Sequence, residues 1–289
     1  MKEAKRVKFT KMHGIGNDYL YVNCMEGIDF DPVAESIKLS DRHFGVGSDG
    51  MILICPSETA DFRMRMFNAD GSEGKMCGNG VRCFAKYVYA KGLTDKTVIR
   101  VETLAGIRTA RLTVENGSVT AVRVDMGSPV FDTADIPVQY PAERLIGQSV
   151  PVAGGVWNIT CLSMGNPHCV VFVDDVDGLD LEKIGPLFEH DPLFPERVNT
   201  EFVQPIDGST VKMRVWERGS GETWACGTGA CAVAVASILN GVVDEDAKAV
   251  TIQLRGGDLR IEWDRTSENS TVYMTGSATF VYEGKTMEE

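Results

Sequence analysis

The 289-residue sequence has few basic residues and no long apolar run. It holds 29 Lys and Arg against 41 Asp and Glu, a formal net charge of −12, which argues against nucleic-acid and anionic-membrane partners because both require a basic surface. The most apolar segment, 225–239, is interrupted by Gly, Thr and Ser and is too short to cross a bilayer. The basic N-terminus is not followed by the apolar core of a signal peptide. We therefore expect a cytoplasmic globular protein.

Closely spaced cysteine pairs are also missing, although the chain has eight cysteines. No C-x-x-C occurs, and the shortest spacings separate Cys77 from Cys83 and Cys226 from Cys231. On a helix these spacings of six and five residues turn the two side chains away from each other. The pattern argues against a structural zinc site and against a thiol oxidoreductase. Without an export signal, thiols are favoured over a disulfide framework.

Two apolar helical segments stand out in a chain that is otherwise rich in β-branched residues. The predicted helices, 81–92 and 230–241, each follow a cysteine and end at Gly92 or Gly241, which suit a left-handed C-cap. The second helix is apolar on nearly every side and should be buried all round. No linker divides the chain, and the turn-rich segment 125–137 is the best candidate boundary. Strands are predicted at 97–106, 118–127, 168–176, 251–263 and 271–282.

The cysteine motifs C-G-N-G and C-G-T-G indicate an internal duplication. Cys77 and Cys226 are separated by 226 − 77 = 149 residues. We interpret this offset as two homologous halves, each bringing a similar set of groups to one shared site. The same offset relates Asn17 to Asn166, Gly50 to Asn199, Asn68 to Glu217 and Gly92 to Gly241.

A cysteine in front of a glycine-rich helix start suits acid–base chemistry. The unpaired N–H groups and the helix dipole favour an anion there and should lower the pKa of the thiol toward neutrality. The glycines allow a ligand to approach the backbone, and Asn79 or Thr228 is a candidate helix cap. Two such thiols on opposite faces of one carbon can remove a proton and deliver another, which inverts the stereocentre. For either motif alone, an inert buried cysteine is the competing interpretation.

Three further side chains are candidates for the same site. His168 and Glu217 could adjust the pKa of the two thiols. Glu217 and Arg218 could bind an ammonium group and a carboxylate, because a guanidinium can hold a carboxylate with two hydrogen bonds. The competing interpretations are a structural histidine and an exposed ion pair between Glu217 and Arg218.

The sequence resembles the diaminopimelate epimerase family over nearly its whole length. The matching motifs are KMHGIGNDY, GVGSDGMI, FNADGSEGKMCGNGVRC, MGNPHCVVFVDDV, FPERVNTEFV and RVWERGSGETWACGTGACA. The resemblance implies interconversion of L,L- and meso-diaminopimelate in lysine and peptidoglycan precursor synthesis, with no pyridoxal phosphate, other cofactor or metal. It also implies an α+β fold with two similar domains, each an antiparallel sheet curled around a central helix, and an active site in the cleft between them. The expected domains are 1–127 and 128–276, with the last strand, about 277–289, returning to the first.

Carried onto matching positions, the resemblance also implies the roles of individual residues. Cys77 and Cys226 would be the acid–base pair, and His168 and Glu217 would adjust their pKa values. The implied substrate-binding residues are Asn17, Gly50, Asn68, Gly78, Asn79, Asn166, Asn199, Glu217, Arg218, Gly227 and Thr228.

The resemblance further implies a homodimer, since Tyr282 matches a tyrosine linked to dimer formation. The chain departs from the family pattern at three positions. Gly50 stands where some members have Gln, Tyr19 where Phe is common, and Thr200 where an aliphatic residue is usual.

Two other functions remain open. A proline or hydroxyproline racemase-like enzyme of the same superfamily would use the same cysteines, but its one-carboxylate substrate does not require four asparagines together with Glu217 and Arg218. A non-catalytic amino-acid-binding protein with duplicated lobes would need neither cysteine.

Overall fold

The computed structural model describes residues 6–267 and 269–287 and divides into two compact units. The first unit extends to Val124 and takes up the chain again at Gly276, and the second is Asp125–Thr275. Within the described residues, no helix is both long and apolar enough to pass through a bilayer.

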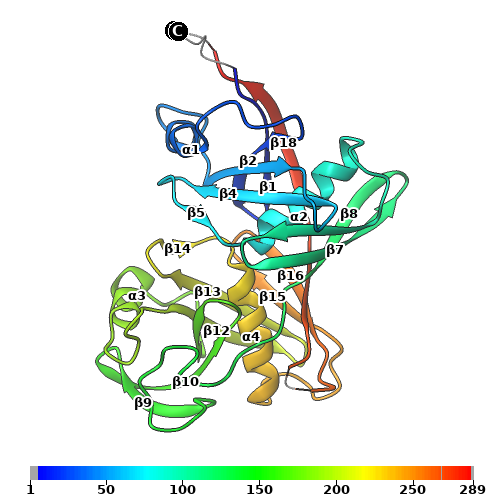
Figure 1. Ribbon diagram of the computed structural model, residues 1–289. Helices are drawn as coiled ribbons and strands as arrows, with labels where there is room; N and C mark the ends of the chain where they lie inside the picture. Colours follow the sequence, from blue (N-terminus) through cyan, green and yellow to red (C-terminus); the bar gives the residue numbers. More distant parts are fainter. Residues whose placement is uncertain (1–5, 268, 288–289) are drawn as a thin grey trace. The chain divides into compact units, whose positions relative to one another are not determined.

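The first unit is one twisted sheet with two helices (Figure 1). Its strands are hydrogen-bonded in the order β18–β1–β2–β3–β4–β6–β7–β8, and β5 pairs with β4. The last strand of the chain is therefore antiparallel to the first. The elements are β1 (Lys8–Gly14), β2 (Asn17–Asn23), α1 (Pro32–Ser40), β3 (Gly50–Cys55), β4 (Phe62–Asn68), β5 (Glu73–Gly74), α2 (Gly78–Ala90), β6 (Val98–Thr103), β7 (Gly106–Glu115), β8 (Ser118–Asp125) and β18 (Thr279–Lys285).

The second unit repeats this arrangement. Its strands run in the order β9–β10–β11–β12–β13–β15–β16–β17, with β14 beside β13. The helices also repeat with the 149-residue offset: α3 begins and ends 149 residues after α1, and α4 begins and ends 149 residues after α2. The elements are β9 (Gln148–Val152), β10 (Gly155–Ser163), β11 (Pro167–Phe172), α3 (Leu181–Glu189), β12 (Asn199–Asp207), β13 (Thr210–Glu217), β14 (Gly221–Thr223), α4 (Gly227–Leu239), β15 (Val250–Leu254), β16 (Gly257–Trp263) and β17 (Val272–Gly276).

The sheets are largely antiparallel, as the resemblance implies, but each also contains parallel pairs. In the first unit β2 pairs with β3, and β4 with β6, in parallel. In the second unit the corresponding parallel pairs are β11 with β12 and β13 with β15. A helix lies in each connection, since a parallel pair needs a long crossover rather than a hairpin.

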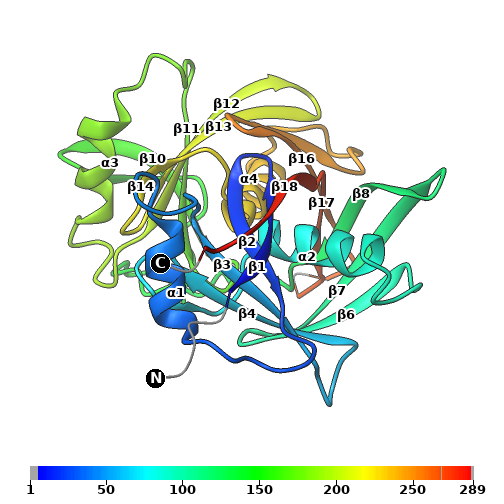
Figure 2. The ribbon, with the colours of Figure 1, turned by 90° about the horizontal axis from the view of Figure 1, so that it is seen from above.

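One helix of each unit packs inside the curve of its sheet. The helix α2 contacts β1, β2 and β7, and α4 contacts β10, β11, β12, β15 and β16; Figure 2 shows the strands of the second unit beside α4. Residues 230–237 of α4 are all buried, which confirms the prediction of a helix enclosed on every side. Gly92 and Gly241 follow the ends of α2 and α4 with φ of 69° and 63°, as predicted for left-handed C-caps.

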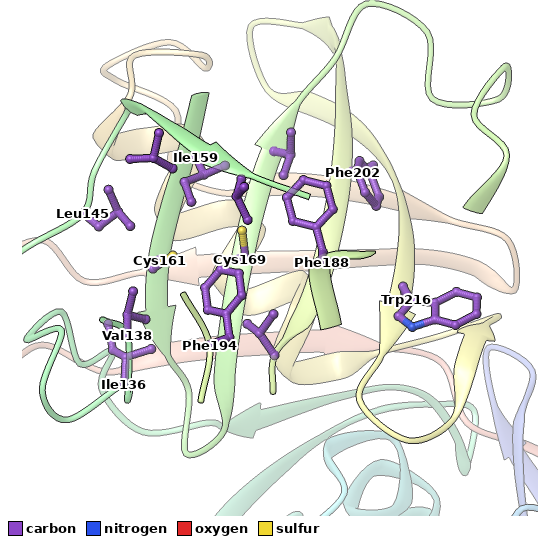
Figure 3. Packing of buried hydrophobic residues seen from close by; sticks show 14 of the residues in the cluster. Ile136, Val138, Leu145, Ile159, Cys161, Cys169, Phe188, Phe194, Phe202 and Trp216 are labelled. Carbon is purple, nitrogen blue, oxygen red and sulfur yellow. The ribbon is translucent and has the colours of Figure 1, made fainter. Parts of the chain in front are cut away.

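The other helix of each unit covers the opposite face of the sheet. In the second unit α3 contributes Phe188, whose ring lies edge-on to Phe202 of β12 at a centroid distance of 5.4 Å. Figure 3 shows this cluster, which includes Cys169 of β11. Because side chains alternate across a strand, the neighbours of Cys169 and Phe202, His168 and Glu201, face the opposite side, toward α4.

Candidate active site

Cys77 and Cys226 are the N-cap residues of α2 and α4. Both have extended backbones, with φ and ψ of −133° and 117° at Cys77 and −115° and 108° at Cys226. Each sulfur accepts a hydrogen bond from the backbone N–H three residues later, Gly80 or Gly229, at 3.4 Å. The two thiols therefore occupy equivalent positions at the positive ends of two duplicated helices.

Asn79 and Thr228 are not the caps, so that expectation is wrong. Both residues lie inside the first helical turn, because the cysteine side chain already takes the capping position. The Oδ1 atom of Asn79 accepts from Nη1 of the buried Arg82 at 2.8 Å. The hydroxyl of Thr228 lies 3.6 Å from the sulfur of Cys226.

The second glycine of each motif lets the helix start lie close to the strand beneath it. A Cβ atom at Gly80 would lie 2.8 Å from Cδ1 of Ile52, and one at Gly229 would lie 2.6 Å from Oε1 of Glu201. The sequence predicts that the glycines allow a ligand to approach the backbone. The structure shows that Gly80 and Gly229 also allow close approach of the chain's own sheet. The first glycines, Gly78 and Gly227, are the first residues of the helices, where backbone N–H groups have no partner within the helix.

In the first unit, the thiol of Cys77 is oriented by a chain of hydrogen bonds. Its Sγ–H donates to Oδ1 of Asn17 at 3.3 Å, and Nδ2 of Asn17 donates to Asp49 at 2.7 Å. Asp49 also accepts from the backbone of Asp18 and from Arg42. Asp49 is not among the residues predicted from the sequence. Its carboxylate fixes the Asn17 amide so that the oxygen faces the sulfur.

Gly50 and Asn68 face each other across β3 and β4. A Cβ atom at Gly50 would lie 2.1 Å from the carbonyl oxygen of Phe67, so with this backbone the position can offer only main-chain groups. This is the physical reason that a glutamine side chain has no place here. The side chain of Asn68 donates from Nδ2 to Ser72 at 3.0 Å.

In the second unit, a buried pair of side chains lies behind the cysteine. His168 and Glu201 are both fully buried, and Nδ1 of His168 lies 2.7 Å from Oε1 of Glu201. Nε2 of His168 lies 3.1 Å from Oδ1 of Asn166. The predicted residues His168 and Asn166 are thus brought together, whereas Glu201 was not identified from the sequence.

The environment of Cys226 raises the pKa of its thiol well above the ordinary value. Burial is the main cause, and the negative charges of Glu217 and Glu201 act in the same direction. The Thr228 hydroxyl and the Gly229 N–H oppose them without reversing the direction. The prediction of a lowered pKa is therefore wrong for Cys226, because burial and two carboxylates outweigh the helix start.

The segment that contains Glu217 and Arg218 is held by side chains from neighbouring strands. Glu217 accepts a hydrogen bond from the Thr223 hydroxyl. The Arg218 N–H donates to Oδ1 of Asn199 at 2.9 Å, and Nδ2 of Asn199 donates to the Pro167 carbonyl at 3.0 Å. Both ends of the buried Asn199 amide thus bind the protein itself. The guanidinium of Arg218 donates to the Glu196 carbonyl at 3.0 Å.

Glu189, at the end of α3, supports this segment from below. Its carboxylate accepts from Nε1 of Trp216 at 2.8 Å and from the Gly219 N–H at 2.9 Å. Glu189 was also absent from the predicted site, since its role depends on contacts that the local sequence does not reveal.

Comparison with known proteins places the chain in a family. A family model described as diaminopimelate epimerase matches residues 9–131 and 160–281. The chain belongs to the diaminopimelate epimerase family. The family resemblance is thereby confirmed, and so is the predicted enzyme class, an isomerase that acts as an epimerase.

Two relatives show how close the membership is. The diaminopimelate epimerase of Acetivibrio thermocellus is 58% identical over 279 residues, covering 96% of this chain and 98% of that protein. The enzyme of the same name from Methanococcus maripaludis is 54% identical over 279 residues, covering 96% and 99%.

The fold of this epimerase family member is shared with more distant solved structures. A hydroxyproline epimerase from Agrobacterium vitis aligns with a TM-score of 0.69 at 14% identity, covering 99% of this chain and 92% of that one. A PhzF-family phenazine biosynthesis protein from Bacillus anthracis aligns with a TM-score of 0.66 at 19% identity, covering 98% and 100%. At these identities the likeness concerns the fold.

Proposed function

We propose that this protein epimerises L,L-diaminopimelate to meso-diaminopimelate, with Cys77 and Cys226 acting on opposite faces of one α-carbon. The observation that carries the proposal is a repeated arrangement in a member of this family: the duplicated helices α2 and α4 each begin at an N-cap cysteine. The reaction would supply a precursor of lysine and peptidoglycan. Proton transfer between carbon and sulfur requires neither pyridoxal phosphate nor a metal.

The mechanism consists of two proton transfers. The thiolate of one cysteine takes the α-proton, forming an S–H bond and leaving the C–H electron pair on the carbon. The thiol of the other cysteine delivers its proton to the opposite face of that carbon and becomes a thiolate. The roles of the cysteines are then exchanged, so each must act as base in one direction and as acid in the other.

The proposal also assigns the groups that bind the substrate. The N–H groups of Gly78, Asn79, Gly227 and Thr228 receive the carboxylate next to the reacting carbon, because first-turn N–H groups and the helix dipole favour an anion. This contact also stabilises the charge that develops on the carboxylate in the transition state. The remaining polar set suits a ligand with two amino-acid ends and consists of Asn17, Gly50, Asn68, Asn166, Asn199, Glu217 and Arg218, with His168 and Glu217 adjusting the pKa of the thiols.

Incubation of the reduced protein with L,L-diaminopimelate in D₂O tests this proposal. At early times we expect meso product that carries deuterium at one α-carbon while the remaining substrate is still protonated, because base and acid lie on opposite faces. Product that retains the original proton would indicate one base serving both faces. Racemisation of proline without turnover of diaminopimelate would assign the protein to the racemase-like alternative.

We also propose that the protein is a cytoplasmic homodimer to which Tyr282 contributes. Tyr282 lies on β18 with 44% of its surface exposed, and its ring is edge-on to Phe9 at 6.2 Å. In sedimentation experiments we expect a dimer for the wild type and a shift toward monomer for Tyr282→Ala. The neighbouring Val281 is 51% exposed, and Val281→Ala provides a control. A monomeric wild type would contradict the proposal.

A further inference from the structure

The two half-sites differ at one buried position next to the cysteine. Ile52 and Glu201 are duplicate residues, since β2 and β3 share the parallel register of β11 and β12: Ile52 lies opposite Tyr21, and Glu201 opposite Val170. Both side chains lie against the second glycine of the cysteine motif in their own half. A Cβ atom at Gly80 would touch Ile52, and one at Gly229 would touch Glu201. The first cysteine is therefore supported by a methyl group and the second by a carboxyl group.

The carboxyl group of Glu201 contacts His168 and is shielded from solvent. Glu201 is 0% exposed, and among the described residues its Oε2 atom has no hydrogen-bond partner. Burying such a group costs several kcal/mol unless it is compensated (about 1–3 for an unpaired polar atom, more for a charge). The duplicate strand has Ile52 at this position, and an isoleucine can be buried without that cost. The buried carboxyl group of Glu201 therefore points to a function rather than to packing.

Glu201 determines how His168 holds its protons. Oδ1 of Asn166 is an acceptor, so the Nε2 atom 3.1 Å away carries a proton. The 2.7 Å contact between Nδ1 and Oε1 then contains one further proton, on the imidazole or on the carboxyl group. With that proton the pair is neutral overall, and without it the pair carries one negative charge close to Cys226.

We propose that Glu201 is a positioning residue of the second half-site: its carboxyl group fixes the ring orientation of His168 and keeps Cys226 in the protonated thiol form. The first half-site has Ile52 in its place, so this carboxyl group acts on the second cysteine and has no counterpart beside the first. The proposal rests on the proposed function in assigning Cys226 as a proton donor, but its effect on the thiol can be measured without turnover.

Charged and titratable groups from every neighbouring element enter this assignment. Burial raises the pKa of Cys226 most, followed by Glu217 of β13 and then Glu201 of β12. Burial is also the main cause that raises the pKa of Glu201; His168 opposes it and Glu217 adds to it. Burial and Cys161 are the main causes that raise the pKa of Cys169 on β11, and Glu201 acts in the same direction. Removing the Glu201 carboxyl group therefore lowers the pKa of the Cys226 thiol.

Thiol alkylation tests the proposal in the intact protein. The rate of iodoacetamide modification is measured separately for Cys77 and Cys226 by peptide mass spectrometry across a range of pH. With Glu201→Gln we expect the midpoint for Cys226 to fall by at least about one pH unit, or roughly tenfold in rate below the midpoint, because only the thiolate reacts. The midpoint for Cys77 should not move, which provides an internal control.

Three further variants separate this effect from damage to the strand. Glu201→Ile installs the side chain of the first half and should lower the alkylation midpoint of Cys226 as Glu201→Gln does. Glu201→Asp retains a carboxylate, so its midpoint should lie close to the wild-type value. Thr200→Val is the matched control, because Thr200 is fully buried on the other face of β12 and its hydroxyl has no hydrogen-bond partner in the part of the chain that the structure describes.

The epimerase assay provides the second readout. The limb of the kcat pH profile that reports Cys226 should move with the alkylation midpoint, with little change in KM. An unchanged alkylation midpoint for Cys226 in folded Glu201→Gln and Glu201→Ile would overturn the proposal. Loss of folding in both variants would also overturn it, because Glu201 would then have a purely structural role. An unchanged midpoint in an active epimerase defeats this inference alone. A shifted midpoint in a protein that does not turn over diaminopimelate defeats the proposed function alone.

Discussion

Replacing either Cys77 or Cys226 by alanine should lower kcat for diaminopimelate epimerisation by about 10³-fold or more while the protein still folds. Removing a positioned acid or base typically costs 10²–10⁴-fold, and here each thiol is required once in every turnover. The alanine also removes a helix N-cap, at a cost of about 0.5–2 kcal/mol. That is smaller than the 5–15 kcal/mol by which folded proteins are usually stable.

Hydrogen exchange distinguishes this loss from simple damage to the site. In Cys226→Ala the remaining Cys77 can still take a proton and return deuterium from solvent on the same face. We therefore expect each single variant to exchange the α-hydrogen of one epimer without inverting it. Cys83→Ala and Cys231→Ala are the matched controls, since these buried cysteines lie on α2 and α4 but are not N-caps. Near-wild-type turnover in either N-cap variant would refute the two-cysteine mechanism.

The parts of the site that could be predicted are those that local sequence controls. A cysteine followed by glycines and an apolar run specifies a helix start within a few residues, and its repetition at a fixed offset revealed the duplication. The same offset holds for α1 and α3, yet neither helix was predicted. The segment at Leu181–Glu189 has no side-chain N-cap hydrogen bond and contains Pro186, so it depends on packing against β12, β13 and β14.

The remainder of the site depends on which strands pair and what each strand face contacts. Glu201 follows Thr200 and precedes two apolar residues in "NTEFV", which reads as an ordinary buried strand. Only the parallel pairing with β11 brings it beside His168. A comparison of duplicate positions would have found it, because the offset sets Glu201 against Ile52. Asp49 and Glu189 likewise carry no local signal, and the pKa of Cys226 follows burial and neighbouring carboxylates rather than the helix start.

Gly185→Ala should destabilise the protein by about 2 kcal/mol, although alanine is the better helix former. A Cβ atom at Gly185 in α3 would lie 2.2–2.6 Å from three ring atoms of Trp216. The indole cannot move aside, because it is 8% exposed and its Nε1 donates to Glu189 at 2.8 Å. Overpacking typically costs about 1–3 kcal/mol, and the helix propensity gained from replacing glycine offsets up to about 1 kcal/mol. Chemical denaturation measures the difference.

The control and the rescue both lie close by. Leu187→Ala changes an exposed side chain on the same helix and should shift stability by no more than about 0.5 kcal/mol. A smaller ring in the double variant Gly185→Ala, Trp216→Phe should recover part of the loss, and a double-mutant cycle reports that coupling. Displacement of Trp216 would also release the Glu189 contact with Gly219, so KM for diaminopimelate should rise while the alkylation midpoint of Cys77 stays constant. Equal stability of Gly185→Ala and wild type would show that α3 and Trp216 can separate at no cost, and the segment carrying Glu217 and Arg218 would then need another support.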